Sequence, residues 1–109
     1  FDIMVFPSLF SEGCPLSMLE GMAMRKAVIG STAGAIPEIL EDRVNGILVQ
    51  PGDSEAIAAA IEELIQNTAL RTRLGDNAGK RIDELSQDRE HIEWLRANLE
   101  AAWVHRPER

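Results

Sequence analysis

Two glutamates, Glu12 and Glu20, are the residues of this sequence whose type and spacing suggest chemistry. Glu12 stands in a stretch that contains Gly and Pro and follows an apolar run, which is typical of a loop after a strand. Glu20 stands eight positions later, about two turns into a segment with the apolar spacing of an α-helix. One carboxylate can therefore face a ligand at the start of the helix while the other reaches along its side.

Three short apolar runs predict the strands that must hold these glutamates. They cover residues 3–6, 27–30 and 47–49. A helix of about residues 15–24 and a helical turn of residues 37–40 separate them. Strands connected through helices are parallel, with right-handed crossovers and helices on both faces of the sheet. The loops after the strands are therefore expected to meet at one edge of the sheet, where ligands bind in such folds. These loops are residues 8–15, 31–35 and 51–53.

The remainder of the chain is predicted to be helical, with Asp53 or Ser54 as the first cap. Its apolar side chains fall into three stripes of helical spacing. The stripes are Ile57, Ile61, Leu64 and Ile65; Leu70, Leu74, Ala78, Ile82 and Leu85; and Ile92, Leu95, Leu99, Ala102 and Trp103. Gly75 and Gly79 have the spacing of a membrane dimer motif, but the Arg and Asp residues around them exclude a bilayer setting. The sequence thus predicts an α/β fold with a three-stranded parallel sheet flanked by helices and a helical C-terminal segment.

Composition limits the classes of partner. The chain has 109 residues, enough for one domain with its own core, and a formal net charge of −7. That charge opposes a nucleic-acid groove or an anionic membrane surface as the main partner, because both require clustered Lys and Arg. Its apolar runs are far shorter than the roughly 20 residues that span a bilayer. The one cysteine, Cys14, forms no internal disulfide, so we expect a cytoplasmic protein.

Residues 7–65 carry an ordered series of motifs. The series begins with E-x7-E at Glu12 and Glu20 together with an E-G-x-P-L loop. It continues with a small-Gly-small-Ile-Pro-Glu segment that ends at Glu38, and it finishes with N-G-x-L-V-x-P-G-D at residues 45–53. In this order and spacing the sequence resembles retaining glycosyltransferases of the two-domain GT-B fold, of the group 1 or family 4 type. The matching part is the carboxyl-terminal half of the domain that binds the nucleotide sugar.

This resemblance implies a domain organisation. Residues 1–109 would form half of a Rossmann-like domain, which is a partial nucleotide-sugar-binding domain. Residues 1–53 would be its donor-site part and residues 54–109 its helical part. The family's catalytic unit also needs an acceptor-binding domain and the first half of this domain, and the sequence contains neither. We therefore interpret the chain, which starts at Phe1 directly before a predicted strand, as a fragment of a hexosyltransferase-like enzyme that is inactive alone.

The resemblance also implies roles for single residues. Glu12 would be the catalytic residue, beside hydroxyls of the donor sugar, and Glu20 would bind the ribose hydroxyls. The donor sugar and its diphosphate would be bound by Gly13, Cys14, Pro15, Leu16 and Ser17. Ionised carboxylates accept hydrogen bonds from vicinal hydroxyls, and a helix N-terminus offers unpaired N–H groups to a phosphate, so the residue types suit these roles. The family implies a nucleotide diphosphate sugar as donor, with no metal and no cofactor.

Two further expectations concern conformation and assembly. Ala35 and Arg43 stand where the family commonly has Gly, which puts the conformation of their loops in question. In the family's strand order, residues 3–6 would pair with a strand from the missing half. We therefore expect an unpaired strand edge that recruits a second copy, as a homodimer or a swapped assembly.

Several alternatives were weighed. The alternative function is a non-catalytic oligomerisation or interaction module on the same fold. A retaining glycosidase needs carboxyl groups about 5 Å apart, which the helical offset opposes. An unrelated nucleotide-binding protein would need G-x-G-x-x-G or a P-loop, and neither occurs. For Glu38, two roles fit equally well: an acid that stabilises the first turn of a helix, and a contact with the ligand. Cys14 fits a small loop residue better than a nucleophile.

Overall fold

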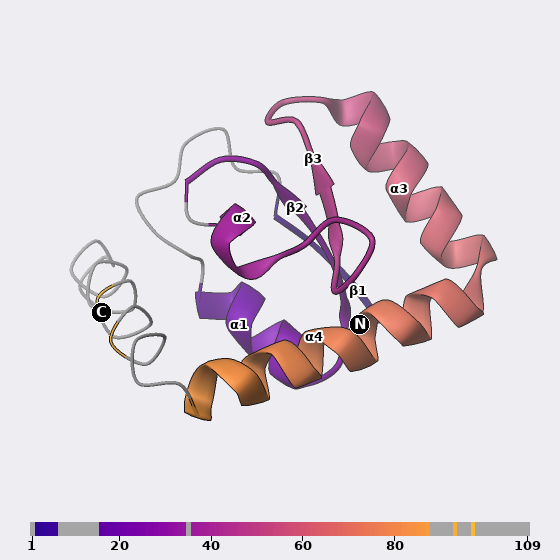
Figure 1. The fold of residues 1–109 in the computed structure, drawn as a ribbon. Helices are drawn as coiled ribbons and strands as arrows, with labels where there is room; N and C mark the ends of the chain where they lie inside the picture. Colours follow the sequence, from indigo (N-terminus) through magenta and orange to yellow (C-terminus); the bar gives the residue numbers. More distant parts are fainter. Residues whose placement is uncertain (1, 7–15, 35, 88–92, 94–96, 98–109) are drawn as a thin grey trace, which may run out of the picture.

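The computed structural model describes residues 2–6, 16–34, 36–87, 93 and 97 (Figure 1). Strands and helices alternate up to β3, after which two helices follow in succession. The elements are β1 (Ile3–Phe6), α1 (Leu16–Ala23), β2 (Ala27–Ser31), α2 (Ile36–Ile39), β3 (Ile47–Val49), α3 (Ser54–Gln66) and α4 (Thr68–Gln87). The predicted third apolar stripe, which starts at Ile92, lies entirely outside the described residues.

The three strands form one parallel sheet in the order β1-β2-β3. Ile3 is opposite Ala27 in the first pair of strands, and Ile29 is opposite Ile47 in the second. The predicted α/β class and parallel three-stranded sheet are therefore confirmed. β1 pairs with β2 on one side and with no other described strand, so the predicted unpaired edge is present in the described part of the chain.

Alternate residues of each strand face opposite sides of the sheet, and each side has its own core. On one side, residues of α1, α2 and the second half of α4 pack against the sheet (Figure 1). This core contains Met18, Leu19, Met22, Val28, Ile36, Ile39, Leu40, Ala78 and Leu85. On the other side, α3 and the first turns of α4 cover Ala27, Ile29, Ile47 and Val49. The prediction of helices on both faces is confirmed for the described residues.

Capping residues determine where α3 ends and where α3 and α4 begin. Asp53 is the N-cap of α3, and its carboxylate accepts a hydrogen bond of 3.0 Å from the backbone N–H of Ala56, as predicted. Asn67 then serves two helices. Its backbone N–H donates to Glu63 at the end of α3, and its side-chain oxygen accepts from the N–H of Leu70 in α4. One residue is therefore enough to separate the two helices.

The first predicted helical stripe is wrong at one position. Leu64 is fully buried, but Ile65 is 61% exposed, and Ala60 lies in the core instead. Each step of four residues rotates about 40° around a helix axis, so a stripe that continues from Ile57 through Ile61 to Ile65 drifts away from the sheet. The second predicted stripe is confirmed: Leu70, Leu74, Ala78 and Leu85 are buried, with Ile82 partly buried. Within the described residues, no helix is long and apolar enough to cross a membrane.

Candidate functional site

The carboxyl ends of the three parallel strands lie at one edge of the sheet, at Phe6, Ser31 and Val49. The loop after β2 is fastened there, because the N–H of Thr32 donates to the carbonyl of Val49 at 2.9 Å. The hydroxyl of the buried Ser31 accepts a hydrogen bond from the N–H of Ala33. The loop after β2 therefore starts beside the end of β3. The loop after β1 lies outside the described residues.

α1 carries the described part of the predicted donor site. Its core-facing side chains Met18, Leu19 and Met22 are buried, which leaves Ser17 and Glu20 exposed on the opposite side. Positions three apart lie on one helix face, so the hydroxyl and the carboxylate are presented together to solvent. The first turn of α1 contains no acidic side chain, which keeps the positive end of the helix dipole available to an anion.

Part of the predicted donor site falls outside the residues that the structure describes. Glu12, Gly13, Cys14 and Pro15 lie outside the described residues, as does the side chain of Leu16. Their predicted roles, together with those of Ser17 and Glu20, stay predictions. Among the described residues, no three His, Cys, Asp or Glu side chains are grouped so as to hold a metal ion.

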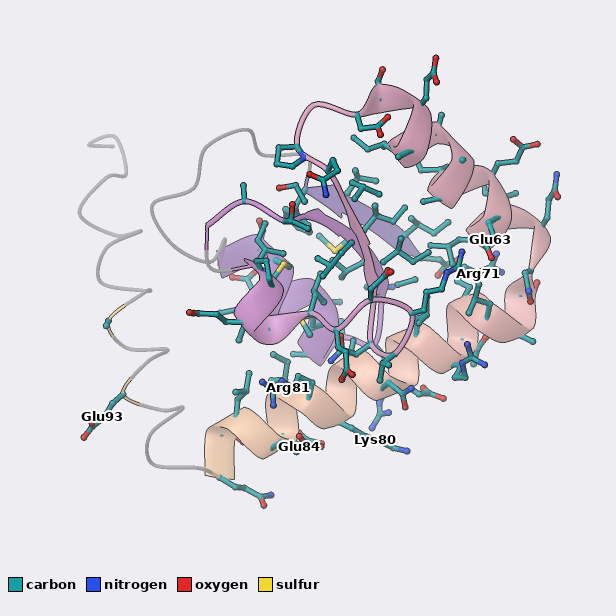
Figure 2. The ribbon with its side chains drawn as sticks, turned by 45° about the horizontal axis from the view of Figure 1, so that its top comes forward. Glu63, Arg71, Lys80, Arg81, Glu84 and Glu93 are labelled. Carbon is teal, nitrogen blue, oxygen red and sulfur yellow. The ribbon has the colours of Figure 1, made fainter. Side chains whose placement is uncertain are left out.

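Two side chains of α4 hold α2 and the turn that leads into β3. Asn77 donates to the carbonyl of Val44 at 2.7 Å, and the guanidinium of Arg81 donates to the carbonyl of Glu38 at 3.2 Å. Glu38 itself is exposed in the first turn of α2. A groove of ≈ 650 Å³ lies between α2, this turn and α4, and Figure 2 shows Lys80, Arg81 and Glu84 on the stretch of α4 beside it. The turn precedes β3, so this groove is not formed by the loops at the carboxyl ends of the strands.

Arg43 fixes the same turn to α3. Its two terminal nitrogens lie 3.0 and 2.7 Å from the two carboxylate oxygens of Glu63, in a bidentate ion pair. The guanidinium hydrogen bond lowers the pKa of Glu63, and the same hydrogen bond raises the pKa of Arg43. Arg43 adopts φ 64°, a left-handed conformation in which glycine is favoured. The glycine that the resemblance implies at this position would suit this conformation, which Arg43 adopts at a cost.

A second residue of this kind, which was not predicted from the sequence, lies at the end of α1. Arg25 has φ 60° and is the first of two positive-φ residues that are not glycine in the described chain. A signal was present, because only residues 24–26 separate α1 from β2. So short a reversal after a helix commonly requires a left-handed residue.

The sequence is similar to those of known glycosyltransferases. The family model described as "Glycosyl transferases group 1" matches residues 1–67. The amylovoran biosynthesis glycosyltransferase AmsK of Erwinia amylovora is 38% identical over 73 residues, which are 62% of this chain and 18% of that protein. The O-antigen chain mannosyltransferase C of Escherichia coli is 34% identical over 83 residues, 74% of this chain and 22% of that protein. The chain thus spans about a fifth of the length of these curated relatives.

Solved structures show the same relationship. The C-terminal domain of a glycosyl transferase group 1 family protein, LpcC from Francisella tularensis, matches with a TM-score of 0.70 and 40% identity. That match covers 77% of this chain and 43% of the solved one. HepE of Anabaena, solved in complex with UDP-glucose, matches with a TM-score of 0.74 and 26% identity over 88% of this chain and 28% of HepE. The described fold therefore matches part of the C-terminal domain of LpcC and part of HepE.

Proposed function

Because the chain belongs to the glycosyl transferases group 1 family, we propose that it is the donor-binding part of a retaining, hexosyltransferase-like glycosyltransferase. The observation that carries the proposal is the family match over residues 1–67, which includes both glutamates of the E-x7-E motif. A second support comes from HepE, a structural relative that was solved with UDP-glucose. The proposed ligand is a nucleotide diphosphate sugar, bound without a metal or another cofactor.

The proposed roles follow the geometry of α1. The exposed Glu20 carboxylate accepts hydrogen bonds from the two ribose hydroxyls, since an ionised carboxylate offers two acceptor oxygens. The backbone of residues 13–17 binds the sugar and diphosphate at the positive end of the helix. Glu12 is the catalytic residue beside the donor sugar. The absence of an acidic side chain from the first turn of α1 supports this arrangement, because an acid there would repel the diphosphate.

A titration tests the binding site. The chain is titrated calorimetrically with uridine, guanosine and adenosine diphosphate sugars, alongside Glu20→Ala and the matched control Glu55→Ala, which removes an exposed carboxylate from α3. We expect one donor series to bind, with affinity reduced in Glu20→Ala and retained in Glu55→Ala. Equal affinities in all three proteins, or no binding to any donor, would contradict the assignment of the site.

Turnover is proposed to need more than this chain, because the match covers only 18% and 22% of the length of the two curated relatives. The isolated chain should neither transfer nor hydrolyse the donor sugar, and the retained anomeric configuration should appear only in products of a longer protein that contains the chain. Nuclear magnetic resonance of the product's anomeric proton distinguishes retention from inversion. Transfer by the isolated chain would refute this part of the proposal.

The assembly is proposed to be a homodimer or swapped dimer through β1. A twofold axis would place the edge of β1 that pairs with no described strand antiparallel to itself, so that the N–H and C=O groups of two copies meet there. A groove of ≈ 400 Å³ beside this edge contains Ile3, Val5, Ile61 and the exposed Ile65, which adds apolar surface. Ile65→Glu should shift the mass in light scattering toward the monomer, while Met24→Glu, a matched change of an exposed side chain on another surface, should not.

The second candidate function is a non-catalytic oligomerisation or interaction module, and the free β1 edge favours it. The donor titration and light scattering together separate the two functions. A dimer that binds no donor supports the module, whereas donor binding that depends on Glu20 supports the glycosyltransferase.

We also propose a cytoplasmic location, which suits a chain with one cysteine. Cell fractionation with an antibody against the chain tests it.

A further inference from the structure

The end of α1 is built around a left-handed residue. The N–H of Arg25 donates to the carbonyl of Met22 at 3.0 Å, and the N–H of Lys26 donates to the carbonyl of Gly21 at 2.9 Å. This pair of bonds, with Arg25 at φ 60°, is a Schellman ending in which arginine occupies the position that glycine usually takes. The turn reverses the chain into β2 within three residues, so it fixes where α1 stops relative to the sheet.

Two glycines of α4 form the surface on which this turn lies. A Cβ atom added at Gly75 would overlap the backbone oxygen of Arg25, and a Cβ atom at Gly79 would lie 3.0 Å from the Cγ atom of Arg25. Both glycines are buried. The Arg25 side chain continues along α4, where its guanidinium lies 3.5 Å from the carboxylate of Asp76. We call the contact of the Arg25 turn with Gly75 and Gly79 the α1 seat.

The position of the turn at the α1 seat affects the position of the whole helix, because α1 is short. The helix has eight residues, and its described anchors are the buried face with Met18 and Met22 and the turn at its end. A displacement of the turn by an inserted methyl group is therefore passed directly to Ser17 and Glu20. A misplacement of about 1 Å can lower a reaction rate about a hundredfold, so we expect a shift of α1 to affect the donor site as well as the stability of the fold.

We propose that the α1 seat positions Ser17 and Glu20 for the donor, with Arg25, Gly75 and Gly79 as positioning residues that do not themselves touch the ligand. The inference rests on the proposed function for its ligand. It assigns a reason to the Gly75 and Gly79 pair, which is to let the backbone of one helix end approach another helix closely. It also predicts different effects for substitutions at the two glycines, because Gly75 faces the backbone of Arg25 and Gly79 faces its side chain.

That difference sets the experiment. Gly75→Ala pushes against backbone, so it should displace α1 and weaken donor binding by about tenfold or more. Gly79→Ala pushes against a flexible side chain, so it should act more weakly. Arg25→Gly should remove the obstacle to Gly79→Ala while keeping the left-handed turn. The double variant Arg25→Gly/Gly79→Ala should therefore regain wild-type behaviour, whereas Arg25→Gly/Gly75→Ala should not.

Two readouts are measured for each variant. Amide chemical shifts of residues 16–23 report the position of α1 without any ligand, and calorimetry reports donor affinity. The matched control is Ile47→Ala, which destabilises the core on the opposite face of the sheet and should leave the α1 amides unshifted. If Gly75→Ala does not fold, the rescue of Gly79→Ala by Arg25→Gly decides the inference.

The outcomes for the seat and for the proposed function are separate. Unchanged α1 amides in Gly75→Ala and Gly79→Ala, or no rescue by Arg25→Gly, would overturn the seat. Donor affinity that is unaffected by Glu20→Ala would overturn the proposed ligand contact while leaving the amide shifts to decide the seat. Displaced α1 amides with unchanged donor affinity would show that the seat is structural only and would also overturn the inference.

Discussion

Replacing Arg43 by glycine should give a more stable protein than replacing it by alanine, with the stability of the wild type between the two. Arg43 has φ 64°, and a left-handed conformation costs a residue with a Cβ atom about 1–2 kcal/mol relative to glycine. Glycine loses part of that advantage because it makes the unfolded chain more flexible, by about 0.4–1 kcal/mol. Both substitutions remove the ion pair between Arg43 and Glu63, whose side chains are 55% and 37% exposed, so that the pair contributes only modestly.

These terms determine the size of the effect. The two substitutions lose the same ion pair, so their difference reflects backbone conformation alone. Glycine should be the more stable of the two by about 1 kcal/mol. For a chain of this size, that difference corresponds to about 4 °C in the melting temperature. The wild-type protein should lie between the two variants, because Arg43 bears the same backbone cost as alanine and its ion pair offsets only part of that cost.

The assay is thermal and urea unfolding of wild type, Arg43→Gly, Arg43→Ala and Glu63→Gln at low and high salt. Glu63→Gln is the control that removes the charge of the pair and keeps the backbone. High salt should narrow the gap between wild type and Arg43→Ala, since salt screens exposed ion pairs, but should leave the gap between alanine and glycine unchanged. An alanine variant as stable as the glycine variant would refute the conformational reasoning.

Three further predictions follow from named contacts. Arg43 lowers the pKa of Glu63 in the folded protein, so the contribution of the pair is present above the unfolded pKa of the carboxyl group and is lost as the pH falls through its folded pKa. The difference in melting temperature between wild type and Glu63→Gln should therefore shrink toward acid, and a difference that grows toward acid would contradict it. Asp53→Ala should lower the free energy of unfolding by about 1 kcal/mol in urea unfolding, because it removes the N-cap of α3, while Asp53→Asn should retain most of the stability. Leu64→Ala should cost about 2–5 kcal/mol because it opens a cavity in a fully buried site, and Ile65→Ala, at an exposed neighbour, should cost far less by the same measurement.

Local sequence was sufficient for the features that depend on neighbouring residues. The strands at residues 3–6 and 47–49 and the Asp53 cap were predicted where the structure has them, and the second strand was one residue short, because apolar runs and caps act over a few positions. The family followed from motifs of fixed spacing, which the match over residues 1–67 confirms. Glu12 and Glu20 were singled out in the same way, and their roles stay predictions.

Tertiary structure decided the features that depend on a distant partner. Ile65 continues an apolar stripe in sequence, yet it is exposed, since only the position of the sheet determines where the buried face of α3 ends. Arg25 has no glycine signal and becomes left-handed because a three-residue reversal must join α1 to β2. Gly75 and Gly79 have a spacing that indicates close packing, but the sequence contains no sign of the partner. That partner is the end of a helix fifty residues earlier, and contacts over such separations depend on the whole chain being folded.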